Sequence, residues 1–357
     1  MPGFKRAVIL SDGIRGHFHQ SLGVANWLER LEEVKLEKVI EVPKLTGIRK
    51  IIMMKILARK LASRDGDYSR EWLKTSGASF GEFKPNTLFI SAGSSAAPFC
   101  LALAKSTGNK AAVIMTPSVL GTKPFDFAVV PEHDKHDDSD KNIIITLGAP
   151  NHIYRPDLKE ESKKFFAGKD FTDSKKVIAL LIGGSDANYN VTPEFIEKIL
   201  TPLHGLNDDT RILLTTSRRT GKAVDDVIEK IFTGCKNIDY MLLASRQPDI
   251  NPVPAMLGAA THVIVTEDSV SMASESITAG FRVGLIRVPR FNNFVKKLLG
   301  YGASRFDDLF TKFQEKDLLL DLGRSPDYAN FIDLPEQKHG RNFNEARRAA
   351  ECILNMP

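Results

Sequence analysis

The chain has 357 residues, of which 42% are hydrophobic and 26% are charged. This is an ordinary globular composition, and at roughly 150 residues per domain the length leaves room for two domains. It excludes a disordered chain and a small disulfide-stapled fold. The three cysteines are widely spaced, no apolar run approaches the roughly 18 residues of a membrane span, and the amino terminus lacks a secretory pattern, so we expect a cytoplasmic protein.

Short β-branched runs alternate with helical patterns along the chain. In the first half, strands are expected at residues 7–10, 87–91, 112–115 and 127–131, with helices at 19–31 and 96–106. In the second half, strands are expected at 177–182, 211–215, 240–243, 263–266 and 283–286, with helices at 193–201, 223–232 and 271–279. Because the strands are apolar runs, they predict parallel sheets covered by helices on both faces. We therefore predict an α/β chain with two Rossmann-like, doubly wound domains.

A charged segment at residues 155–176 separates the two halves and has no strand pattern, which predicts a linker. The expected domains are residues 1–155 and 176–340, and a helix within residues 341–357 is expected to pack back on the first domain. The polar loop at residues 132–141 contains histidines and aspartates, but no recognised ligand spacing supports a metal site there. A solvated acidic loop is the favoured interpretation, and we expect no metal ion.

The turn SDGIRGH at residues 11–17 follows the first strand and opens the first helix. Its two glycines lack the dinucleotide-binding spacing, so they indicate a ligand site only weakly and fit a tight turn equally well. His17 is more informative, because ligands bind at the carboxyl edge of a doubly wound sheet and an imidazole there can act as a base. A capping histidine is the alternative, and Asp12 is the less favoured base. The residues expected on the acceptor side are Gly13, Gly16, Gly93 and Ser94.

Three loops in the second half carry candidate ligands for a nucleotide. A glycine turn, an arginine pair and a serine-rich loop each follow a strand, and arginine forks and helix amino ends both attract phosphate oxygens. Taken singly, Ser269 and Ser271 are more often N-caps than ligand contacts. Glu275 can accept from a ribose diol, and Glu267 is the lesser candidate for that role. The expected nucleotide-binding residues are Gly183, Gly184, Ser185, Ser217, Arg218, Arg219, Asp268, Ser269, Ser271 and Glu275.

These patterns resemble the GT-B glycosyltransferases, in particular the transferase that adds N-acetylglucosamine to the lipid-linked peptidoglycan precursor. Gly16 and His17 match part of the early glycine-glycine-histidine turn of that enzyme, although Arg15 replaces a glycine. Ser274 and Glu275 match its late serine and glutamate. The resemblance implies that Glu275 holds the donor ribose.

A closer resemblance, over almost the whole chain, is to the family named after the plant elongated-mitochondria fission factor, whose bacterial relatives are regarded as glycosyltransferases. The shared motifs are SDGIRGHFHQSLGVANWL, PEHD, TLGAPN, LLIGGS, TSRRTG and TEDSVSMASES. The resemblance implies a GT-B-like fold whose two domains face a cleft. It places a nucleotide-sugar donor, with a UDP-sugar favoured, on the C-terminal domain and the acceptor on the N-terminal domain, with no tightly bound cofactor.

Two alternatives stay open beside a metal-independent glycosyltransferase that acts on a glycan or lipid-linked acceptor. Sugar-nucleotide epimerases share the fold and carry a DSGGxxEE-like turn, but Val270 and Ser271 stand where its glycines would be. The mitochondrial namesake suggests a non-catalytic, membrane-associated scaffold. A pure scaffold would not need Arg219, Ser269 and Glu275 together with Ser271, which favours a working nucleotide site.

The basic residues have one notable concentration. The net charge of +5 is diffuse, and we expect no nucleic-acid partner, but residues 48–64 contain six Lys or Arg and no acidic residue. One interpretation is a packed amphipathic helix with a solvated basic edge. The other is a helix that lies on an anionic membrane surface, at the inner face of the membrane, which would suit a lipid-linked acceptor.

Overall fold

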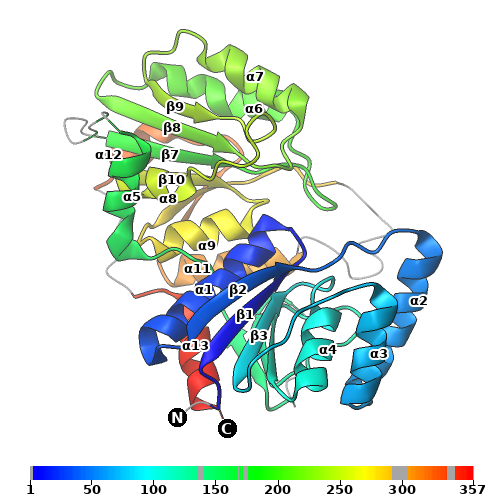
Figure 1. Cartoon of the computed structure of the whole chain (residues 1–357). Coiled ribbons are helices and arrows are strands. Elements are labelled where there is room, and N and C mark those ends of the chain that lie inside the picture. Colours follow the sequence, from blue (N-terminus) through cyan, green and yellow to red (C-terminus); the bar gives the residue numbers. More distant parts are fainter. Residues whose placement is uncertain are drawn as a thin grey trace. The chain divides into compact units, whose positions relative to one another are not determined.

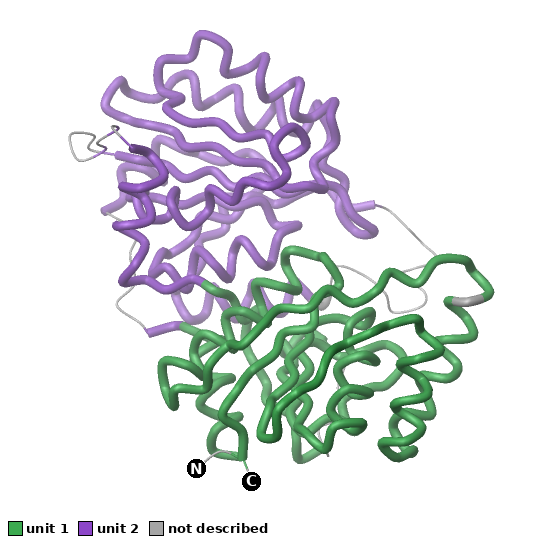
Figure 2. Tube along the Cα trace, viewed as in Figure 1, with its two compact units in different colours: residues 1–152, 344–357 green, residues 153–343 purple. Residues whose placement is uncertain are grey.

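The computed structural model describes residues 3–134, 140–167, 169, 171, 176–291, 304–335 and 342–356. It divides into two compact units, one formed by residues 1–152 with 344–357 and the other by residues 153–343 (Figure 2). Each unit contains one six-stranded sheet in which all neighbouring strands are parallel.

The first sheet has the strand order β2-β1-β3-β4-β5-β6, and β1, β2 and β3 are labelled in Figure 1. Its strands are β1 (Arg6–Ser11), β2 (Lys35–Glu41), β3 (Thr87–Ala92), β4 (Lys110–Ile114), β5 (Phe127–Pro131) and β6 (Ile143–Thr146). The helices of this unit are α1 (Arg15–Glu32), α2 (Ile48–Arg59), the 3-10 turn η1 (Lys60–Ala62), α3 (Gly66–Ser76), α4 (Ala97–Thr107) and α13 (Glu345–Asn355).

Side chains of β1 alternate between two hydrophobic clusters, one on each face of the first sheet. Val8 and Leu10 pack in a cluster with residues of α2, α3 and α4, whereas Ala7 and Ile9 pack in a cluster with residues of α1 and α13. Both faces of the sheet are therefore covered by helices, which explains why its central strands are apolar on both sides.

The second sheet has the strand order β12-β11-β10-β7-β8-β9. Its strands are β7 (Lys176–Ile182), β8 (Thr210–Thr216), β9 (Ile238–Leu242), β10 (His262–Thr266), β11 (Val283–Ile286) and β12 (Leu319–Gly323). The helices of this unit are η2 (Arg155–Asp157), α5 (Leu158–Phe165), α6 (Pro193–Leu200), η3 (Thr201–Gly205), α7 (Lys222–Phe232), α8 (Val253–Ala259), α9 (Val270–Thr278), α11 (Ser304–Glu315) and α12 (Tyr328–Asp333). The prediction of an α/β chain with two Rossmann-like, doubly wound units is confirmed.

Helices in both units begin at side chains that cap the first turn. Asp65 accepts the backbone N–H of Tyr68 at the start of α3, and Thr192 accepts that of Phe195 at the start of α6. In each case a carboxylate or hydroxyl oxygen satisfies an amide that has no partner within the helix. These short polar residues therefore fix where the chain leaves its loops and turns back along the sheet.

The prediction that residues 155–176 form a linker is wrong. It contains η2 and α5, and α5 packs against α8 within the second unit. Leu158 and Ser162 are buried one turn apart, and a Cβ added to Gly258 would lie 2.0 Å from the carbonyl oxygen of Leu158. A narrow buried edge on an otherwise charged helix gives a weak hydrophobic pattern, which is why the composition suggested a linker.

Candidate functional site

Each sheet has a point where the order of the strands reverses. In the first sheet β2 lies on one side of β1 and β3 on the other, and in the second sheet β8 and β10 flank β7 in the same way. At such a point the loops that leave the carboxyl ends of the two strands diverge, and ligands of doubly wound folds bind there. The predicted residues of both halves follow the strands at these two points.

At the first point, Asp12 and His17 form a hydrogen-bonded pair. The Nδ1 atom of His17 lies 2.9 Å from Oδ2 of Asp12, whose other oxygen accepts the backbone N–H of Ile14. Burial opposes ionisation of Asp12, but the hydrogen bond and charge of His17 outweigh it and hold the pKa of Asp12 below its ordinary value. An ionised carboxylate can only accept, so Nδ1 of His17 donates, and Nε2 is left as the atom that can take a proton.

Gly93 brings the end of β3 against this pair. Its φ is +79°, and an added Cβ would lie 2.5 Å from Cε1 of His17. Both the backbone conformation and the contact with the imidazole therefore require glycine. Gly13 also has a positive φ, of +80°, but open space surrounds it and Gly16. Ser94 is exposed, and its Oγ accepts the backbone N–H of Ser118 at 2.9 Å.

A pocket in the first unit opens next to the same strand ends. Its volume is about 370 Å³, and its lining includes Asp12 after β1, Val42 after β2, Ser94 after β3 and Ser118 after β4. Residues of α2 line it as well. No local sequence pattern indicates this pocket, because the residues that form it come from loops and helices scattered over the first 119 positions.

At the second point, two glycines allow close packing of the chain on itself. Gly183 and Gly184 donate their backbone N–H groups to Thr266 Oγ1 and Asp268 Oδ2, each at 2.7 Å. A Cβ added to Gly183 would lie 1.8 Å from Asp268, and one added to Gly184 would lie 2.2 Å from the backbone of Arg219. The glycines are thus needed for contact with protein atoms. Ser185 is also internally bonded, since its Oγ accepts the backbone N–H of Val191.

Arg219 holds this loop together. Its guanidinium donates to the carbonyl oxygen of Gly184 at 3.0 Å and to Asp268 Oδ2 at 3.0 Å, and it lies 3.4 Å from Asp186. Burial raises the pKa of Asp268 to about 6, although the charge of Arg219 opposes the shift. The Oγ of Ser217 accepts the backbone N–H of Arg219. Contact of Arg219 with a diphosphate stays a prediction, and the structure adds this internal role.

The serine-rich loop leads into α9. Ser269 is the N-cap of this helix, and its Oγ accepts the backbone N–H of Met272, which confirms the capping interpretation for this residue. Ser271 is half-buried in the first turn, and Glu275 is buried in the second. Arg218 is exposed. Ribose binding by Glu275 stays a prediction.

Glu267 has a structural role, which corrects its assignment as the lesser ribose candidate. Its carboxylate is 1% exposed and pairs with Arg287 at 3.1 Å and with Arg290. The other oxygen accepts the backbone N–H of Val288 at 3.0 Å. A carboxylate with three such partners is not available to a ribose hydroxyl.

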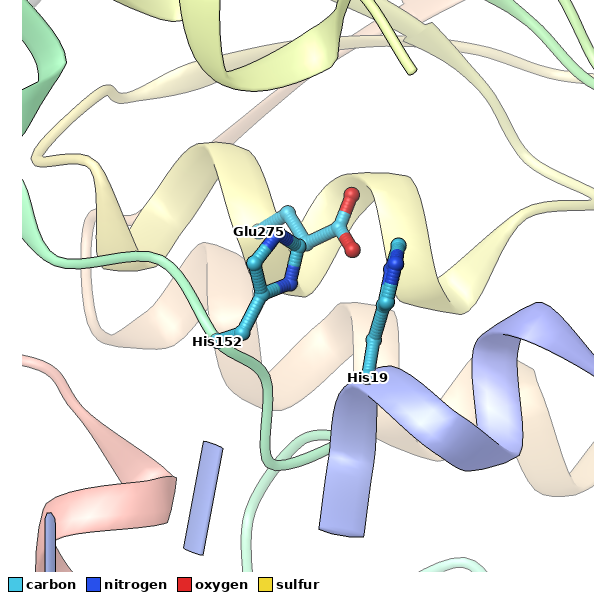
Figure 3. Close-up of side chains that lie close together, drawn as sticks. All are labelled: His19, His152 and Glu275. Carbon is cyan, nitrogen blue, oxygen red and sulfur yellow. The ribbon is translucent and has the colours of Figure 1, made fainter. Parts of the chain in front are cut away.

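Histidines of the first unit lie close to other potential metal ligands at two places. In the polar loop, His133 Nε2 lies 4.0 Å from an oxygen of Asp134, and the neighbouring His136 and Asp137 lie outside the described residues. His19 of α1 and His152 face each other, with ring centroids 4.1 Å apart (Figure 3). Glu275, also labelled in Figure 3, belongs to α9 of the second unit.

Residues 15–356 match the family described as mitochondrial fission ELM1. The chain belongs to this family. Among curated proteins, the uncharacterised protein RP120 of Rickettsia prowazekii is 26% identical over 307 residues, which cover 75% of this chain and 79% of the relative.

Three solved structures are similar to this member of the ELM1 family over almost its whole length. MnaA of S. aureus with UDP is 13% identical, with a TM-score of 0.49, over 99% of this chain and 95% of its own. UDP-GlcNAc 2-epimerase of Neisseria meningitidis is 11% identical, with a TM-score of 0.48, over 98% of each chain. A family 9 glycosyl transferase of Veillonella parvula is 13% identical, with a TM-score of 0.45, over 98% of this chain and 97% of its own.

None of the described helices is long and apolar enough to cross a membrane. The basic segment expected at residues 48–64 forms α2 and η1. Met54, Ala58 and Leu61 are buried in the hydrophobic cluster, so the packed-helix interpretation holds for this edge. The opposite edge is different, because Ile48 is 77% exposed and Ile52 53% exposed. Contact of this exposed edge with an anionic membrane surface stays a prediction.

Proposed function

We propose that the protein is a glycosyltransferase that moves a sugar from a nucleotide-sugar, with a UDP-sugar favoured, to a hydroxyl group of an acceptor. The second unit would bind the donor and the first unit the acceptor. The observation that carries the proposal is the Asp12–His17 pair at the strand-order reversal of the first sheet. A carboxylate that orients an imidazole at such an edge is the arrangement of a general base.

The proposed reaction assigns one proton transfer to His17. The acceptor oxygen forms a bond to the anomeric carbon, the bond between that carbon and the diphosphate oxygen breaks, and the nucleoside diphosphate leaves with the electron pair. The acceptor proton passes to Nε2 of His17. Asp12 accepts from Nδ1 throughout and stabilises the imidazolium that forms.

On the donor side, the proposed diphosphate site is the amino end of α9. The first turn of a helix leaves backbone amides without partners inside the helix, and their dipoles favour an anion. The buried carboxylate of Asp268 would repel a diphosphate if it stood alone, and its ion pair with Arg219 offsets this charge. Glu275, in the second turn of the same helix, is the proposed ribose ligand.

The acceptor is proposed to be a lipid-linked or envelope glycan at an anionic membrane surface. On α2, the exposed Ile48, Ile52 and Ile56 lie beside the exposed cations Lys55 and Arg59. Apolar side chains flanked by Lys and Arg are the composition of helices that lie in a membrane interface. A protein attached in this way would meet acceptors that are anchored in the bilayer.

A thermal-shift panel of UDP, GDP, ADP and CMP conjugates of sugars tests the donor. We expect a UDP-sugar to raise the melting temperature, since a ligand at about 100 times its dissociation constant stabilises a protein by about 2.7 kcal/mol. Glu275→Gln should weaken binding of the ribonucleotide and leave the affinity for its 2′,3′-dideoxy analogue unchanged. If no conjugate shifts the melting temperature, the proposal is wrong. Conversion of the bound sugar-nucleotide without any acceptor would favour an epimerase.

A further inference from the structure

The pocket of the first unit is walled mainly by apolar side chains. Val42, Met54, Trp72 and Phe99 are buried, and Ile51 and Val119 also line the pocket. A pocket of about 370 Å³ is within the range of roughly 300–1,000 Å³ that holds small-molecule ligands. Its walls favour an apolar occupant, and its position at the carboxyl ends of the strands places that occupant next to Asp12.

The charged residues that line the pocket are two lysines and one aspartate. Lys44 and Lys55 are both exposed and both line it. Asp12 is the acidic residue in the lining, and its carboxylate is already bonded to His17. The cations therefore favour an occupant that carries an anionic group at one end.

Trp72 has a buried polar atom. Its side chain lines the pocket and is 3% exposed, and the buried Nε1–H has no hydrogen-bond acceptor among the described residues. A buried donor without a partner is rare in folded proteins and costs free energy. Because this nitrogen is itself buried, it does not decide the chemistry of the occupant, which rests on the apolar walls and on the two lysines.

Helix α2 connects the pocket to an exposed apolar surface. Ile51, Met54 and Lys55 line the pocket, whereas the neighbouring Ile52 and Met53 are exposed and lie outside the lining. One helix thus presents apolar side chains both to the pocket and to solvent. This continuity suits an occupant whose chain comes from a membrane.

We propose that this pocket binds the apolar chain of a lipid phosphate, with the chain against α2 and the phosphate near Lys44 and Lys55. The identification of this lipid as the acceptor rests on the proposed glycosyltransferase function. The binding site itself does not, because it lies in the first unit and is tested without a nucleotide-sugar.

The test uses a series of single-chain alkyl phosphates from hexyl to dodecyl, each kept below its micelle concentration. The chain has two tryptophans, so Trp27→Phe leaves Trp72 as the fluorescent reporter inside the pocket. We expect saturable binding whose affinity rises about fourfold for each added methylene until the pocket is full. Inorganic phosphate should give no signal. Equal affinity along the series, or an equal response to inorganic phosphate, would overturn the proposal.

A matched pair of variants on α2 separates the pocket from the surface. Ile51→Phe enlarges a side chain in the lining and should weaken binding of dodecyl phosphate at least about tenfold. Ile52 is one residue away, exposed and outside the lining, so Ile52→Phe should leave this affinity unchanged. If both weaken binding equally, the probe adsorbs to the surface and the pocket is not its site.

A second variant keeps the test decisive if Ile51→Phe does not fold. Lys44→Glu combined with Lys55→Glu changes two exposed residues and should weaken dodecyl phosphate about tenfold, with no loss for dodecanol. Unchanged affinity for the phosphate would contradict the proposal. If a UDP-sugar still raises the melting temperature but no alkyl phosphate binds, the lipid site is wrong and the proposed glycosyltransferase function stands.

Discussion

The two strand-order reversals use similar turns in different ways. After β1, Asp12 orients His17, and a pocket opens beside this pair. After β7, the loops bond to each other through Gly183, Asp268 and Arg219. A glycine after a strand therefore does not by itself identify a ligand site. At the first reversal, side chains are available to act on a ligand, and at the second, recognition would fall to the backbone amides of α9.

The largest expected effect tests the availability of His17. His17→Ala should lower turnover of the bound nucleotide-sugar by about 10² to 10⁴, the usual contribution of a general base. Affinity for the nucleotide should stay unchanged, because the proposed donor site is in the other unit. Steady-state kinetics beside calorimetry give both quantities. Normal turnover at saturating donor, with weaker donor binding, would remove His17 from catalysis.

The two aspartates should respond to pH in opposite directions. Asp268 has a folded-state pKa of about 6, above its ordinary 3.8, so it binds a proton more tightly in the folded chain. Its contribution favours folding at low pH and is lost as pH rises from about 4 to about 6. Asp12 has a lowered pKa, so its contribution is present at neutral pH and is lost as pH falls.

Unfolding measured between pH 4 and 7 separates these contributions. Because one pKa unit corresponds to about 1.4 kcal/mol, Asp268→Asn should remove on the order of 3 kcal/mol of pH dependence. Asp12→Asn is the matched control. In this variant the free energy of unfolding should still fall as pH rises to about 6, because Asp268 is unchanged. A wild-type profile that Asp268→Asn does not change would show that this carboxyl titrates normally.

The exposed edge of α2 is expected to govern membrane attachment. A basic residue near an anionic surface contributes about 1 kcal/mol, so changing Lys55, Arg59 and Lys60 together to Glu should weaken vesicle binding at least about a hundredfold. Salt should weaken the wild type as well. Co-sedimentation with vesicles that contain anionic lipid measures both effects. Binding that ignores the triple change, or no binding at low salt, would leave α2 as an ordinary packed helix.

The sequence predicted the central strands of both sheets and the edge strand β9, but it missed the other three edge strands. Strands β2, β6 and β12 were not expected, and all three are edge strands. β2 has four charged residues among seven, because an edge strand needs no continuous apolar run. The pairing of Asp12 with His17 lay within one motif and could be anticipated. The Arg219–Asp268 pair and the Trp72 pocket join residues from distant loops, which no local pattern reveals.

The smallest effect compares a glycine from each reversal. Gly183→Ala places a Cβ 1.8 Å from Asp268 and should destabilise the second unit by about 1–3 kcal/mol, since the closely packed loops must move. Gly16 lies in α1 with a helical φ and with no atom within 4 Å of an added Cβ. Gly16→Ala should therefore stabilise the chain by about 0.4–1 kcal/mol, because alanine reduces the conformational freedom of the unfolded chain. Denaturant unfolding measures both changes. Equal destabilisation by the two substitutions would show that the loop after β1 is as closely packed as the loop after β7, and the contrast between the two reversals would not hold.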